Sequence, residues 1–107
     1  MTWTPAEFEI TFLDGSTAKV CGWMHTSGLA IDERGLHGWM ATHIRSGLAV
    51  GESFKTRAQA MDFVECVAHL TAWTRLKTDW RPRAALLDAV RDVADAIRRG
   101  EQEGVTA

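Results

Sequence analysis

Tyrosine is absent from this chain, cysteine and proline occur only twice each, and no apolar run is long. Two cysteines cannot build the disulfide framework of a small secreted domain, so we interpret both as free thiols. No stretch approaches the roughly 18 apolar residues of a membrane span. The first ten residues contain neither a basic leader nor an apolar signal core. We therefore predict a protein without a membrane segment that resides in the cytoplasm.

The sequence also has no excess of positive charge and no familiar catalytic motif. Its formal net charge is -2, which opposes tight, non-specific binding to nucleic acid but leaves room for a local basic patch. It contains no Gly-x-Ser-x-Gly motif, phosphate-binding loop, dinucleotide glycine pattern or His-Glu-x-x-His motif. Thr42-His43 and Asp32-Glu33 can be drawn as an acid and a base, yet ordinary surface positions explain them better. We predict a non-enzymatic protein that needs no cofactor.

Metal-ligand residue types occur in two pairs. Cys21 and His25 share one face of a predicted strand, and Cys66 and His69 are neighbours on a predicted helix. Their spacing is not that of a zinc finger, and the two pairs should lie on opposite sides of the sheet. We therefore predict no metal site.

The stretch from Leu48 to Leu70 organises the rest of the chain. Leu48, Val50 and Phe54 alternate with small or polar residues, as a strand with one buried face requires. From residue 58 the apolar period changes toward 3.6 residues, which indicates a helix. Thr56 and Gln59 have the spacing of a capping box, so the helix should begin at Arg57.

Short alternating segments separated by turn residues precede this junction. The predicted strands cover residues 7–12, 17–24, 29–32, 36–44 and 48–54, with turns at Asp14-Gly15, Ser27-Gly28, Arg34-Gly35 and Ser46-Gly47. Turns this short connect antiparallel neighbours, because parallel strands need a long crossover. We predict an antiparallel meander of four or five strands over residues 7–55.

Two helices complete the predicted α+β fold, which forms a single domain over residues 1–107. The main helix should cover residues 57–73 and back the sheet. The C-terminal helix should run over residues 82–99, with Pro82 in its first turn and Gly100 as its stop. Residues 1–6 and 101–107 are expected to be frayed ends.

The last helix has a narrow apolar seam. The seam consists of Leu86, Val90, Val93 and Ile97. It can pack on its own domain or against a second copy, since a heptad pattern this short does not decide between them. We predict that the protein is a homodimer and treat the seam as a candidate interface.

Five tryptophans stand out in a chain with so few other aromatic residues. If the main helix covers Phe8, Ile10, Phe12, Val20, Met24, Met40, Ile44, Val50 and Phe54, strict alternation places another set on the far face. That set is Lys19, Trp23, His25, His37, Trp39, His43, Arg45 and Lys55. We expect Trp23 and Trp39 to form the centre of a contact surface opposite the main helix.

Rings interleaved with cationic groups have two functional interpretations. Single-stranded nucleic acid stacks on such surfaces, and protein interfaces use the same residues as anchors. The structural alternative is that the last helix or a second subunit covers this face. We predict a small binding or regulatory module with nucleic acid as the favoured ligand. The alternative is a protein-interaction module, an inhibitor or an adaptor, that docks through the same tryptophans.

The junction GESFKTRAQAMDF, which begins at Gly51, carries a family resemblance. It resembles the strand-to-helix junction of the small DNA-binding domains at the N-termini of tyrosine integrases, and similar junctions occur in small uncharacterised proteins of actinobacterial type. The resemblance covers residues 36–70 and implies the fold of this part. In the integrase family the sheet face enters DNA. The resemblance therefore implies contacts from Arg45 and Lys55, which Trp39 and His43 join on this chain's own pattern. Unlike the family, this chain has a sheet that is not basic, extra strands and a last helix.

Overall fold

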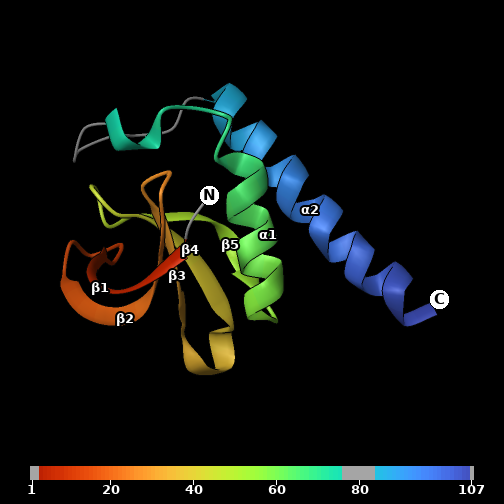
Figure 1. Cartoon of the computed structure of the whole chain (residues 1–107), viewed down its shortest axis with the longest axis horizontal. Coiled ribbons are helices and arrows are strands. Elements are labelled where there is room, and N and C mark those ends of the chain that lie inside the picture. The colour runs from red at the N-terminus through yellow and green to blue at the C-terminus, as the bar shows by residue number, and fades with distance from the viewer. Residues whose placement is uncertain (1–2, 76–83, 107) are drawn as a thin grey trace.

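The computed structural model describes residues 3–75 and 84–106, without the side chains of residues 37, 52 and 100–106. In chain order the elements are β1 (Trp3–Thr11), β2 (Thr17–His25), β3 (Leu29–Glu33), the 3-10 turn η1 (Gly35–His37), β4 (Trp39–His43), β5 (Ala49–Phe54), α1 (Arg57–Val67), the 3-10 turn η2 (Trp73–Arg75) and α2 (Ala84–Thr106). The five strands form one sheet in the order β1-β2-β3-β4-β5, and each neighbouring pair is antiparallel. The predicted α+β fold with a meander and two helices is confirmed (Figure 1).

The start of α1 follows from local side-chain chemistry, but its end does not lie where the sequence predicted. The Thr56 hydroxyl accepts from the Gln59 N–H at 3.1 Å, and the Gln59 side chain accepts from the Thr56 N–H at 3.3 Å. This capping box confirms the predicted start. The predicted end at residue 73 is wrong, because α1 ends at Val67. The indole of Trp73 folds back and donates to the Val67 carbonyl at 3.0 Å, which satisfies an acceptor that a longer helix would have used.

The C-terminal helix is longer than predicted. It continues through Gly100 to Thr106, so the predicted end at residue 99 and the frayed tail at 101–106 are wrong. Glycine costs only about 1 kcal/mol in a helix interior relative to alanine, which does not terminate a helix by itself. The predicted start at Pro82 lies outside the described residues. Among residues 3–75 and 84–106, no helix combines the length and apolarity needed to cross a membrane.

Strand β1 begins at Trp3, so the expectation of a frayed end is wrong for residues 3–6. The Phe12 N–H donates to the Ser16 carbonyl at 2.8 Å. Because N–H and C=O groups alternate in direction along a strand, the even-numbered residues of β1 direct theirs toward β2. Pro5 occupies an odd position opposite Trp23. Its missing N–H would have pointed away from β2, so proline costs the sheet no hydrogen bond there.

The β1–β2 hairpin bends over the sheet face that lies opposite α1. At its tip the Thr11 N–H donates to the Gly47 carbonyl at 2.8 Å, and the Thr11 hydroxyl donates to the Ser46 carbonyl at 3.2 Å. Gly47 has φ of +72°, and a Cβ at this position would overlap the Thr11 hydroxyl. The hairpin therefore reaches the β4–β5 turn, and the sheet is strongly curled (Figure 1).

Because of this curl, both faces of the sheet are buried. We call the face toward α1 the helix side and the face toward the hairpin the hairpin side. The helix-side core is made of Leu29, Ile31, Ala41, Val50, Phe54, Ala60, Phe63, Val64, Val67, Trp73, Val90 and Ala94. The hairpin-side core is made of Phe8, Ile10 and Ala30, with Ala18, Val20 and Ile44 packed against it.

The predicted inner face is therefore divided between the two sides. Val50 and Phe54 do lie under α1, and the cluster of Phe54, Phe63 and Val67 is buried as predicted. The Phe54 and Phe63 rings are 5.0 Å apart. Phe8, Ile10, Val20 and Ile44 pack on the hairpin side instead, while Phe12 and Met24 are exposed.

Candidate functional site

The tryptophans do not lie where the alternation of residues predicted. Trp23 and Trp39 share one sheet face, but they pack against the helix-side core. The prediction that they lie opposite the main helix is wrong. Arg57, at the start of α1, stands 5.5 Å from the centre of the Trp23 ring. With both faces covered, each face carries apolar residues, so alternation cannot identify the face that α1 covers.

The two strand histidines are structural. His43 is fully buried, with Nδ1 2.7 Å from the Ser46 hydroxyl and Nε2 2.8 Å from the Trp73 carbonyl oxygen. His25 is 1% exposed, and its Nδ1 lies 2.8 Å from the Ser27 hydroxyl. These positions exclude both histidines from a surface that contacts a ligand.

The remaining predicted contact residues do not form one surface. Lys19 is exposed on β2, and Arg45 donates from Nη1 to the Thr74 carbonyl at 3.0 Å. Arg45 precedes β5 and Lys55 follows it, so the two basic residues lie at opposite ends of that strand. The His37 side chain lies outside the described residues. The structure thus does not assemble the eight predicted residues into a contact face.

The apolar seam of α2 is used within the chain. Val90 is 4% exposed, and the other three seam residues, Leu86, Val93 and Ile97, are partly buried against the helix-side core. Of the two alternatives, the structure shows the seam packed on its own domain, and its use as a dimer interface stays a prediction. The predicted homodimer likewise stays a prediction.

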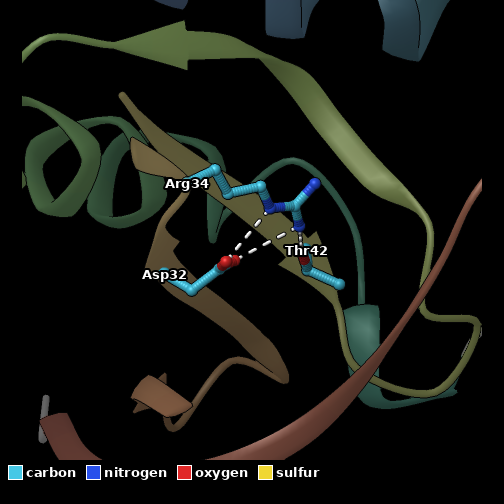
Figure 2. Close-up of polar contacts among 3 residues, drawn as sticks. All are labelled: Asp32, Arg34 and Thr42. Atoms are coloured by element: carbon cyan, nitrogen blue, oxygen red, sulfur yellow. Dashed lines mark hydrogen bonds and ion pairs between the residues drawn. The ribbon is translucent and has the colours of Figure 1, made fainter. Parts of the chain in front are cut away.

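The hairpin side contains an ion pair that the sequence did not reveal. Asp32 is 1% exposed and Thr42 is fully buried. Arg34 donates from Nε and Nη2 to the two carboxylate oxygens of Asp32, at 3.0 and 3.2 Å, and from Nη2 to the Thr42 hydroxyl at 3.2 Å. Figure 2 shows the guanidinium folded back over the sheet, with Nη1 pointing away from Asp32. No described residue makes a hydrogen bond to Nη1, so its two N–H groups are available.

A cavity of about 530 Å³ opens above this guanidinium. We call it the hairpin pocket. It is lined by Thr11, Phe12, Leu13, Gly15, Arg34, Leu48 and Ala49. Phe12 is 46% exposed and Leu13 is fully exposed, so the hairpin tip presents large apolar groups at the mouth. The volume lies in the range of about 300–1,000 Å³ that is typical of ligand pockets.

A second depression, of about 280 Å³, follows the outer edge of β5 beside α2. We call it the edge groove. It is lined by Ala49, Gly51, Leu87, Val90, Arg91, Ala94, Asp95 and Arg98. A smaller cavity of about 70 Å³ lies between β5, Trp73 and the start of α2. Ala49 lines all three spaces, so they adjoin at the start of β5.

The backbone of Ala49 faces this junction. The Leu48 carbonyl accepts from the His43 N–H at 2.9 Å and therefore points toward β4. The N–H and C=O of one strand residue point to the same side, and those of the next residue point to the opposite side. The N–H and C=O of Ala49 therefore point away from β4, to the outer edge of the sheet. No described residue occupies these two groups. The start of β5 is therefore an unpaired strand edge.

The second half of β5 is less suited to pairing with another strand. Arg98 donates to the Ser53 carbonyl at 2.7 Å, and its guanidinium lies 5.3 Å from the centre of the Phe54 ring. Gly51 has φ of +74°, and a Cβ there would lie 2.8 Å from the Phe63 ring. The pairing with β4 is irregular over this stretch, as at a bulge. Beyond Ala49, the edge is therefore irregular, and its Ser53 carbonyl is already occupied.

This site offers hydrogen bonds and apolar contacts, and it contains no nucleophile paired with a base. Within the described part of the chain, no three His, Cys, Asp or Glu side chains gather in a way that could hold a metal ion. Both cysteines are free thiols, as predicted. The signals that could have indicated the site are modest: a charged residue, Asp32, inside the apolar run of β3, and exposed Leu13 in a turn.

Comparison of the chain with protein-family models, with curated proteins and with solved structures found no match. The resemblance to the integrase DNA-binding domains therefore stays a prediction.

Proposed function

We propose that this chain is a small, non-enzymatic protein-interaction module that receives an extended segment of a partner protein on the edge of β5. The observation that carries the proposal is the outward N–H and C=O of Ala49, at the point where the hairpin pocket and the edge groove meet. An extended peptide adds a strand to such an edge through main-chain hydrogen bonds, and pockets beside the edge select its side chains.

The surroundings of Ala49 favour a peptide that is held by its side chains as well as by main-chain hydrogen bonds. On one side α2 forms a wall, with Leu87 43% exposed above the groove. On the other side the hairpin tip forms a second wall through Phe12 and Leu13. A strand lying between these walls would cover the exposed apolar groups on both sides. The occupied Ser53 carbonyl and the irregular pairing of β5 with β4 favour pairing at the start of the strand.

The same geometry favours protein over nucleic acid. The edge groove contains Arg91, Arg98 and Asp95, and Arg98 is already engaged with Ser53. Several phosphate contacts are needed for appreciable affinity toward nucleic acid. The stacking rings on which that prediction depended pack against the core. Nucleic-acid binding therefore stays a prediction without an identified surface.

Selection from a library of random displayed peptides tests the proposal. Peptides enriched on the wild-type protein should bind at least about tenfold more weakly to Ala49→Pro, because one main-chain hydrogen bond is lost and the edge is blocked. Proline is tolerated here since the N–H of Ala49 does not serve the ladder.

The matched control is Glu7→Pro, which places proline at an outward N–H on the opposite edge strand, β1. It should leave peptide binding unchanged. The proposal fails if no peptide is enriched, or if Ala49→Pro and Glu7→Pro have equal effects.

Two further measurements address the other predicted partners. Titration with single- and double-stranded oligonucleotides at two salt concentrations should show no salt-dependent binding; a steep salt dependence would favour nucleic acid instead. Sedimentation of wild type and Ala49→Pro addresses the predicted homodimer. A dimer that becomes monomeric on Ala49→Pro would show that a second copy, and not another protein, occupies the edge.

A further inference from the structure

We infer that the hairpin pocket is a specificity pocket for an uncharged apolar side chain of the bound segment, and that a carbonyl of this segment not paired with Ala49 accepts hydrogen bonds from Nη1 of Arg34. This inference rests on the proposed function and names the class of ligand that the site selects.

The pocket has the position required for this role. Leu48 and Ala49 form its inner wall, and Ala49 also carries the outward N–H and C=O that a paired strand would use. Residues of an added strand alternate between the two sides of the sheet. One side chain of the segment that pairs at Ala49 would therefore enter the pocket, where Phe12 and Leu13 form the opposite wall.

The guanidinium of Arg34 is fixed in place and can donate to a carbonyl oxygen of a ligand. Three hydrogen bonds to Asp32 and Thr42 engage Nε and Nη2 and fix the plane of the guanidinium. The Arg34 side chain is 22% exposed and lines the pocket, while no described residue bonds to Nη1. A rigid donor fork directed at one side of a pocket binds a carbonyl oxygen without the cost of ordering a flexible side chain.

The charges around the pocket select a neutral ligand. The carboxylate of Asp32 already neutralises the Arg34 guanidinium. Asp14 is exposed in the hairpin turn next to Gly15, where Ser16 hydrogen bonds lower its pKa and keep it ionised. A ligand carboxylate would meet two negative groups and one compensated positive group, so a neutral carbonyl is the better acceptor.

The leucine derivatives N-acetyl-leucinamide and N-acetyl-leucine are probes that differ chiefly in charge. Titration of the full chain, followed by backbone amide NMR, should shift the amides of residues 11–15 and 48–49 with the neutral amide. The acetylated acid should bind more weakly. The inference is overturned if neither probe perturbs these residues, or if the acid binds more tightly.

Two variants test the named contacts. Leu13→Ala should weaken binding of the neutral probe at least about threefold through lost apolar contact, and Leu36→Ala is its control. Leu36 is equally exposed but does not line the pocket. Arg34→Lys keeps a cation beside Asp32 and removes the two N–H groups of Nη1; it should weaken binding of the neutral probe, while Asp14 and Asp32 still disfavour the acid. Unchanged affinity for the neutral probe in Arg34→Lys, with unchanged thermal stability, would contradict the role of Nη1.

The peptide selection separates this inference from the proposed function. Peptides that require the free edge at Ala49 but tolerate Leu13→Ala and Arg34→Lys would overturn the specificity pocket alone. Binding of the neutral probe in the pocket, without enrichment of any peptide, would overturn the proposed function and leave the pocket chemistry in place.

Discussion

On the helix side of the sheet, Phe63, Val64 and Trp73 are at most 1% exposed, whereas on the hairpin side Ile10 and Phe8 are 3% and 7% exposed and the Arg34 side chain is 22% exposed. The two faces of one sheet are thus closed to different degrees. The helix side is sealed by α1 and α2 and includes two histidines whose Nδ1 atoms contact serine hydroxyls.

The hairpin side has a smaller apolar cluster, an ion pair and an open mouth. A curled sheet can bury one face for stability and leave part of the other accessible to a ligand. The candidate site lies where the hairpin meets the start of β5, on the less completely closed face. We therefore expect substitutions on the helix side to affect folding first and substitutions at the pocket mouth to affect binding first.

The largest difference between the faces should appear in matched phenylalanine truncations. Phe63→Ala should reduce the free energy of unfolding by about 4 kcal/mol, because it opens a cavity in a fully enclosed core. Phe8→Ala should cost less, about 3 kcal/mol, since its site lies near the rim of the smaller cluster. Urea denaturation of both variants measures the two values. Equal costs, or a larger cost for Phe8→Ala, would contradict the difference in closure.

The ion pair gives the second test on the hairpin side. Arg34→Met should cost about 3 kcal/mol, because it leaves the buried Asp32 carboxylate unpaired. The double variant Asp32→Leu with Arg34→Met should recover much of this loss, since no uncompensated charge remains. Chemical denaturation at neutral pH provides the comparison. If the double variant is less stable than Arg34→Met, the ion pair adds to the free energy of unfolding by more than the neutralisation of two buried charges.

The smallest effect concerns His25 on the helix side. Burial lowers the pKa of His25, and the nearby Glu65 carboxylate partly opposes this shift. Its Nε2 has no hydrogen-bond partner among the described residues, while the Trp3 ring lies 4.8 Å away. Below the ordinary pKa of about 6.5 the unfolded state binds a proton more readily than the folded state. Stability should therefore fall as pH drops below 6.5 and level off below the folded-state pKa.

The measurement is the free energy of unfolding of wild type and His25→Leu between pH 7.5 and pH 5. The contribution of this one group cannot exceed about 1.4 kcal/mol per pH unit. His25→Leu should show a shallower decline than wild type over this range. Identical pH profiles would show that His25 is not responsible.

Features encoded by neighbouring residues could be predicted from the sequence. The capping box of Thr56 and Gln59 defined the start of α1, and the Asp14-Gly15 turn and the short connections defined an antiparallel meander. Each depends on hydrogen bonds or backbone preferences within a few residues. The burial of Phe63 followed from helical periodicity in the same stretch.

The sequence could not show which strand residues lie on the helix side of the sheet and which lie on the hairpin side. Alternation placed Trp23 and Trp39 together on one face, but it grouped Val50 and Phe54 with Phe8 and Ile10, which lie on the other side of the sheet. The contact of Thr11 with Gly47, between distant parts of the chain, and the packing of Phe8 and Ile10 hold the hairpin over the second face, so that apolar residues on both faces are internal. The same long-range closure brings Leu13, Arg34 and Ala49 around one pocket. The sequence by itself thus determined the elements and their pairing, because these depend on local interactions. The tertiary structure decided the sides of the sheet and the site, because a period of two is identical for either face.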